Sequence, residues 1–223
     1  VGGLLTFAVM RVRESSVRMH EANNFKQLTL AMHNFNDNYH SLPAGVAYRG
    51  QDGKPLLSWR VAILPYIEHG ALYNQFKLDE PWDGPNNIKL LGRMPKVYMR
   101  PGDAPGPDGL THYLAVTGKG TIFDEGRFRR LENGQCMRRN IIEITDGTSN
   151  TLMFVTAAKG VPWTKPEDFD VDAGPIGPRL DTRFSGGTQM GIADGSIRSM
   201  GPRDDAKWRA WMSADGNEIV DGD

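Results

Sequence analysis

Three side chains with metal-binding chemistry recur along one predicted helix. His33, Asp37 and His40 occupy positions i, i+4 and i+7, which share one face of an α-helix. A catalytic zinc would need a further ligand and groups that orient the ligands, and the sequence indicates neither. We therefore expect these residues to lie on the surface or in the packing of the helix, without a metal.

A second concentration of polar groups is the segment ITDGTSNT at residues 144–151. Small polar side chains of this kind satisfy backbone groups in turns. Ser149 would act as a nucleophile only beside a base, and no histidine is close to it in the sequence. The chain has no Gly-x-Ser-x-Gly elbow, phosphate-binding loop or dinucleotide fingerprint. The sequence therefore predicts a protein that is not an enzyme.

The sequence contains few residues that could bind a cofactor or a metal ion. The acidic loops at residues 103–108 and 215–223 could bind calcium, although they lack the ligand spacing of a known calcium loop. Cys136 is the only cysteine, which excludes an intrachain disulfide and zinc sites built on cysteine pairs. A reactive thiol would need cationic neighbours, and Arg138 and Arg139 are nearby in the sequence. We expect no cofactor and an unreactive thiol, with calcium as the alternative.

Two tryptophans in Pro-rich loops are candidates for a ligand surface. Trp82 lies in EPWD and Trp163 in VPWTKPED. Exposed rings of this kind can bind a sugar or another protein, whereas buried ones anchor their loops on the core. We favour the anchoring role and keep both residues as candidate ligand-surface loops.

The composition narrows the class of protein further. The 223 residues carry 26 Lys and Arg against 27 Asp and Glu, for a net charge of −1. A nucleic-acid-binding protein would show a basic excess or a basic stripe, so we expect no nucleic-acid partner. The chain is long enough to bury one good core.

The element that must carry the histidines is a long helix over residues 4–39, which contains no proline. Its apolar positions lie at helical spacing, and polar residues occupy the opposite face. The apolar positions are Val9, Val12, Met19, Ala22, Phe25, Leu28, Met32, Phe35 and Tyr39. The polar positions are Arg18, Glu21, Asn24, Lys26, Gln27 and Asn38. Pro43 disfavours helical geometry at Leu42 and ends the helix.

The beginning of this helix is apolar on all sides. Such a helix would be about 55 Å long, more than a domain with a radius of gyration of about 17 Å can cover, so part of it should project. We expect residues 4–10 to be the end of a longer apolar segment that lies upstream of Val1. The alternative is a helix end buried under the head. The assembly residues we assign here are Leu4, Leu5, Phe7, Val9, Met10 and Val12.

The remainder, residues 43–223, reads as a β-rich head with long loops, separate from the helix at residues 1–42. Strand-like runs occur at residues 96–99, 112–117, 151–157, 188–193 and 196–200. Asp194 and Gly195 predict a tight hairpin turn between the last two runs, with positive φ at both positions. Ser58, Asp83 and Asp204 or Asp205 are candidate N-caps of short helices. We expect an α+β fold with the amphipathic helix on a mostly antiparallel sheet.

Several segments, in this order, resemble a large family of bacterial prepilin-type proteins, also filed as a solute-binding family. The family's C-terminal pattern is His, nine residues, then Asp-Gly. The matching stretches are ANNFKQL (22–28), LAMHNF (30–35), DGKPLLSWRV (52–61), LPYIE (64–68), LDEPWD (78–83), residues 87–97, ITDGTSNT (144–151), VPWTKPED (161–168) and ADGSIR (193–198).

The resemblance implies a type IV pilin-like or type II secretion pseudopilin-like N-terminus. In such proteins a leader is cleaved, and an apolar helix anchors the chain in the inner membrane before packing in a filament core. Two positions depart from the family pattern: Phe184 stands where the family usually has His, and Arg100-Pro101 stands at a frequent Cys-Pro pair. Any role of that His or Cys is therefore not transferable, while the Asp194-Gly195 turn is retained.

These observations predict a structural, pilin-like envelope protein that assembles through its N-terminal helix. We expect it to self-associate or join other pilin-like subunits, with an inner-membrane anchor and a periplasmic head, or to be extracellular after assembly. The alternative is a membrane-tethered periplasmic module that binds a carbohydrate or another solute.

Overall fold

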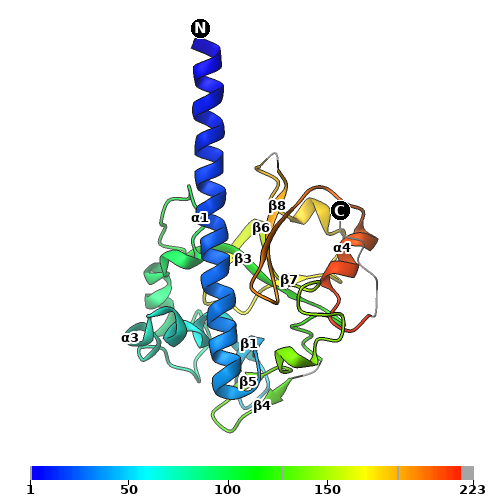
Figure 1. Ribbon diagram of the computed structural model, residues 1–223. Helices are drawn as coiled ribbons and strands as arrows, with labels where there is room; N and C mark the ends of the chain where they lie inside the picture. Colours follow the sequence, from blue (N-terminus) through cyan, green and yellow to red (C-terminus); the bar gives the residue numbers. More distant parts are fainter. Residues whose placement is uncertain (1, 127, 185, 217–223) are drawn as a thin grey trace.

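The chain has the predicted α+β fold. The computed structural model describes residues 2–126, 128–184 and 186–216, with side chains from residue 10 onward inside the first helix. Helix α1 (Gly2–Tyr39) runs along the whole height of the head and projects beyond it (Figure 1). The head, residues 43–216, contains two sheets and several short helices.

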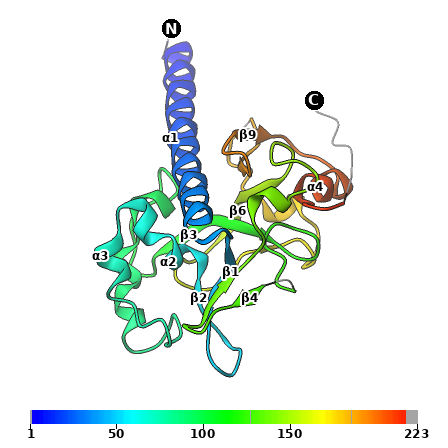
Figure 2. The same cartoon turned by 60° about the horizontal axis from the view of Figure 1, so that its bottom comes forward.

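The strands form a four-stranded and a five-stranded sheet, seen from below in Figure 2. The first has the order β2-β1-β5-β4, with β1 (Pro43–Arg49), β2 (Pro55–Ser58), β4 (Arg129–Arg130) and β5 (Gln135–Met137). The second has the order β7-β3-β6-β8-β9, with β3 (Leu110–Thr117), β6 (Leu152–Pro162), β7 (Phe169–Asp170), β8 (Thr188–Ile192) and β9 (Ile197–Met200). Pairing is antiparallel except between β3 and β7.

The short helices begin at local sequence signals. Ser58 caps α2 (Trp59–Ala62) and Asp204 caps α4 (Asp205–Met212), each by accepting a backbone N–H, as predicted. The remaining α-helix is α3 (Gly70–Tyr73). The 3₁₀ helices are η1 (Leu64–Ile67), η2 (Asn87–Arg93), η3 (Lys96–Tyr98), η4 (Ile141–Glu143) and η5 (Gly177–Arg179).

The five-stranded sheet is buried on both faces. Along β3, Tyr113 and Ala115 belong to the core that contains α1, whereas Leu114 and Val116 belong to the core that contains α4. Successive side chains point to opposite faces of a strand, so the sheet lies between the two helices.

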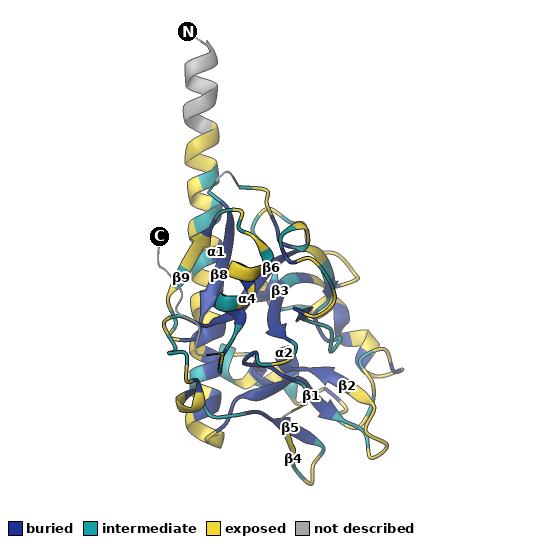
Figure 3. Ribbon diagram, turned by 90° about the vertical axis from the view of Figure 1, so that its right-hand side faces the viewer, coloured by how far each residue is buried: buried dark blue, intermediate teal, exposed yellow. Residues whose placement is uncertain are grey.

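Helix α1 docks through its second half only. Phe25, Leu28, Met32 and Phe35 are fully buried, which confirms the predicted stripe over this part. Val12 and Met19, predicted on the same stripe, are exposed. Met19 faces away from the head, since its neighbours Arg18 and Glu21 both contact the head from the other side of the helix. Figure 3 shows the exposed first part of the helix above its buried second part. Tyr39 is also exposed, where the helix ends.

Two local predictions are wrong. The run at residues 96–99 is not a strand, because Lys96–Tyr98 form the 3₁₀ helix η3. Asp83 does not cap a helix over residues 85–91; the carboxylate of Glu80 accepts the N–H groups of Asn86 and Asn87 just before η2.

The Asp194-Gly195 turn joins β8 and β9, as predicted, by a different geometry. The N–H of Gly195 donates to the carbonyl of Ile192, and the N–H of Ile192 donates to the carbonyl of Ser196. Only Gly195 has a positive φ, 89°, while Asp194 does not. Three residues, Ala193 to Gly195, therefore form the loop, and glycine takes its left-handed position.

Candidate functional site at the junction of helix and head

The first half of α1 exposes large apolar side chains. Met10, Val12 and Met19 are 63%, 70% and 62% exposed, respectively. Leu4, Leu5, Phe7 and Val9, the other predicted assembly residues, lie outside the described side chains. Within the described residues, no helix is both long and apolar enough to span a bilayer.

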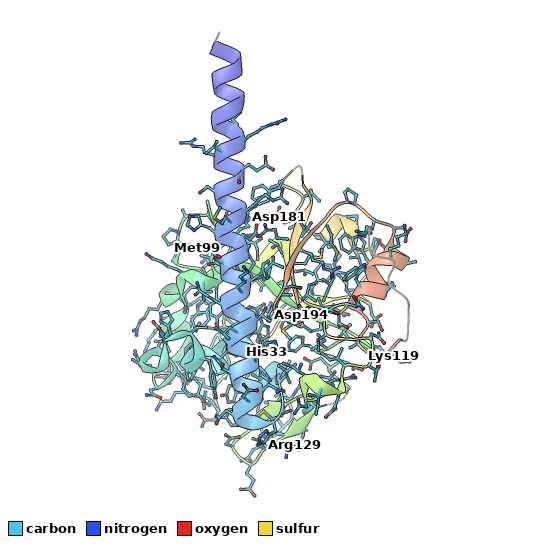
Figure 4. The ribbon with its side chains drawn as sticks, in the orientation of Figure 1. His33, Met99, Lys119, Arg129, Asp181 and Asp194 are labelled. Atoms are coloured by element: carbon cyan, nitrogen blue, oxygen red, sulfur yellow. The ribbon has the colours of Figure 1, made fainter. Side chains whose placement is uncertain are left out.

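A charged network marks the level at which α1 leaves the head. We call Glu21, Arg100, Asp103, Asp181 and Arg183 the junction cluster. Arg183 Nε lies 2.9 Å and Arg100 Nη1 3.0 Å from Asp181 Oδ2. Arg100 also makes two hydrogen bonds to the carboxylate of Asp103, at 2.9 and 3.1 Å. Figure 4 shows Asp181 beside the helix near its exit from the head.

Glu21 connects the helix to this cluster. The sequence placed it on the polar face, but its side chain is buried and accepts a hydrogen bond from Thr156 Oγ1 at 2.9 Å. Arg183 Nη2 lies 3.5 Å from the same oxygen. Burial raises the pKa of Glu21, and the nearby guanidinium of Arg183 partly opposes this. This buried, partnered carboxylate links α1 to the head close to the point where the helix leaves it.

Both departures from the resembled family pattern lie at the cluster. Arg100 occupies the usual Cys position and is itself a member. Phe184 occupies the usual His position, and the guanidinium of Arg183 lies 4.7 Å from its ring centroid. The sequence did not indicate that these positions meet, because they are more than 80 residues apart.

The Asp194-Gly195 turn serves as an attachment point for α1 and for the 144–151 segment. The N–H groups of Ala193 and Asp194 donate to the carbonyls of Thr151 and Thr148, at 2.9 and 3.1 Å. His33 Nε2 donates to the carbonyl of Ala193 at 2.8 Å. Figure 4 shows His33 and Asp194 near each other beside the docked half of α1. The turn thus connects the docked half of α1 to the 144–151 segment by hydrogen bonds.

The candidate metal residues have structural or surface roles. His33 packs as described, while Asp37 and His40 are exposed, and His40 ends the helix with a φ of 52°. The acidic loop 103–108 has its first carboxylate paired with Arg100, and residues 217–223 lie outside the described part. Across the described ranges, no three His, Cys, Asp or Glu side chains are grouped as metal ligands.

The structure also places the two candidate nucleophiles, Ser149 and Cys136. Ser149 is exposed. Cys136 is buried in β5, and burial raises the pKa of its thiol, which disfavours the reactive thiolate.

The two tryptophans differ. Trp163 is fully buried, and its Nε1 donates to the carbonyl of Leu91 at 2.9 Å. Trp163 therefore anchors its loop on the core, the role favoured from the sequence, and its ring stacks on Tyr98 instead of forming a ligand surface. Trp82 is partly buried against the same core, with Lys165 Nζ 5.8 Å from its ring centroid.

A buried ion pair that the sequence did not indicate connects α2 to the segment just before β7. Arg60 Nη2 lies 2.7 Å from Asp168 Oδ1, and both side chains are almost fully buried. That oxygen also accepts hydrogen bonds from Trp59 Nε1 and the N–H of Ala115. The remaining donors of Arg60 reach Ser58 Oγ and the carbonyl of Tyr113. Two segments that carry the family resemblance, SWR (58–60) and PED (166–168), are thus joined by this ion pair and its hydrogen bonds.

One protein family matches most of the chain. The sequence pattern of the SBP_bac_10 family, described as a protein of unknown function (DUF1559), matches residues 10–176. No curated protein and no solved structure matches the chain significantly.

Proposed function

The chain belongs to the SBP_bac_10 (DUF1559) family, and from this premise we propose that it is a pilin-like structural protein of the bacterial cell envelope. It assembles through the undocked part of α1 with further copies or with other pilin-like subunits. It acts without enzymatic activity or a cofactor, and it does not bind nucleic acid. The head is periplasmic while an apolar segment anchors the chain in the inner membrane, or extracellular after assembly.

The observation that carries the proposal is one helix in two environments. The 38 residues of α1 extend about 57 Å at 1.5 Å per residue. Phe25 and Phe35 are fully buried against the head, whereas Met10 and Val12, on the same helix, are mostly exposed. Fully burying each exposed side chain would stabilise an assembly by about 1.5–3 kcal/mol. Packing of the first half of α1 against another helix would therefore be favourable, because these side chains stay exposed in the single chain.

The junction cluster supports the same function. A projecting helix transmits a defined orientation only if its exit from the head is fixed. Glu21 and Arg183 couple the helix to the head at that level, and Arg18 Nη2 reaches the carbonyl of Gly186 at 3.5 Å. These contacts would keep the angle between α1 and the head the same in every subunit.

Charge placed on the free half of α1 is expected to prevent assembly. In the native gene product, replacing Val12 and Met19 by Glu introduces two carboxylates where a neighbouring helix would pack, and an unpaired charge in such a contact is strongly unfavourable. We expect the double variant to sediment as a monomer while the wild type forms oligomers or filaments. Thermal unfolding of the head should not change, because both side chains are more than 60% exposed.

Ile142→Glu is the matched control, since Ile142 is 86% exposed on the head. It should assemble as the wild type does. Normal assembly of the Val12/Met19 double variant would disprove the role of this segment.

One observation favours the alternative of a membrane-tethered ligand-binding module. It is a pocket beside Trp208, whose buried apolar lining residues belong to the core on the other face of the sheet from Trp82 and Trp163.

A further inference from the structure

A small pocket lies between the start of η5, the beginning of β8, the end of β9 and helix α4. Its volume is about 200 Å³. The lining is mainly apolar and includes Leu180, Phe184, Met200 and Pro202. Cavities of about 150 Å³ with apolar walls accept a benzene-sized molecule, so this pocket has room for such a body with a small polar group.

One wall of the pocket carries a buried donor. Trp208 is 2% exposed, and no acceptor for its Nε1–H exists among the described residues. Buried polar groups are nearly always hydrogen-bonded, so an unsatisfied indole N–H needs an explanation. The fully buried indoles of Trp59 and Trp163, by contrast, donate to Asp168 Oδ1 and to the carbonyl of Leu91. The Nε1–H of Trp208 is therefore available to a ligand that enters the pocket.

Gly177 keeps space open next to this donor. Both Gly177 and Trp208 line the pocket, and a Cβ built on Gly177 would lie 4.0 Å from Trp208 Nε1. Arg203 lines the same pocket and brings a positive charge to it. A donor and a cation in the lining of one mainly apolar cavity match an anionic acceptor attached to an apolar body.

We infer that this pocket binds a small monocarboxylate with an apolar body, whose carboxylate accepts the Nε1–H of Trp208 close to Arg203 and whose body packs on Leu180, Phe184 and Met200. The inference does not depend on assembly through α1, because the pocket lies on the face of the sheet opposite that helix.

The test uses benzoate as the probe and the ¹⁵N-labelled chain. Titration should move the indole N–H resonance of Trp208 in a saturable manner, with the resonance assigned by its loss in Trp208→Phe. Removing a hydrogen bond to a charged group should weaken benzoate binding at least about ten-fold in Trp208→Phe, followed at backbone amides around the pocket. Benzamide, which has the same body without the charge, should bind more weakly than benzoate.

Two further variants keep the outcome decisive. Trp211→Phe makes the same change in the same helix at a residue that does not line the pocket, and it should bind benzoate as the wild type does. Gly177→Leu fills the space beside the indole without removing the donor, and it should abolish binding even if Trp208→Phe folds poorly. The inference is overturned if benzoate leaves the Trp208 resonance unchanged up to its solubility limit, or if folded Gly177→Leu binds it normally.

Discussion

Replacing Arg60 by Met is expected to destabilise the head by about 3–5 kcal/mol at pH 7. The change leaves the Asp168 carboxylate buried without its cation, 2.7 Å from where Arg60 Nη2 stood. It also removes the donors that satisfy the carbonyl of Tyr113 and Ser58 Oγ. Urea denaturation at pH 7 measures the loss.

The deficit of this variant should shrink as the pH falls. Burial already raises the pKa of Asp168 to about 6, although Arg60 lowers it in part. Without Arg60 the folded-state pKa rises further above the unfolded value. Folding then favours the protonated form of Asp168. The resulting gain in the free energy of unfolding is fully present below about pH 4, the pKa of an unfolded Asp, and it is lost as the pH rises through the folded-state pKa.

Arg209→Met provides the matched control. Arg209 lies 3.6 Å from Asp172 in a pair that is about half exposed on both sides, and losing such a pair costs less than about 1 kcal/mol. Equal effects of the two substitutions would show that the Arg60–Asp168 pair is not the structural centre of the head.

Phe25→Ala should destabilise the protein by about 3–5 kcal/mol, because it opens a cavity where α1 meets the sheet. The ring of Phe25 is fully buried, and its centroid lies 4.8 Å from that of Tyr113 and 6.3 Å from that of Phe154. Equilibrium unfolding in urea, followed by far-UV circular dichroism, measures the change.

The control for this substitution is on the same helix. Leu30 is 61% exposed, so Leu30→Ala should alter stability by no more than about 0.5 kcal/mol. If the two variants unfold alike, the second half of α1 is not docked on the head in solution.

Local chemistry determined much of the fold and could be read from the sequence. The spacing of Phe25, Leu28, Met32 and Phe35 predicted the docked helix, and each of these side chains is buried. The caps Ser58 and Asp204 act through neighbouring backbone groups and were also predicted. The hairpin at Asp194 was located correctly, though its loop length depends on hydrogen bonds that the dipeptide alone does not fix.

Features that depend on distant residues were missed. Strand β1 is buried at almost every position, so it shows no alternation between apolar and polar residues. Glu21 is buried because Thr156 and Arg183, 135 and 162 residues away, meet it. Val12 and Met19 were predicted on the buried stripe but are exposed, and Met19 is exposed although its neighbours Arg18 and Glu21 contact the head.

The most direct measurement of the central claim is photo-crosslinking from position 12 of α1 in cells that express the native gene product. With a photoreactive residue in place of Val12, we predict adducts between chains whose crosslinked peptides map to the α1 segment of a second copy or of another pilin-like subunit. The same residue at position 142 should give no such adducts. Crosslinks from position 12 that map only to the chain's own head would contradict assembly through the free half of the helix.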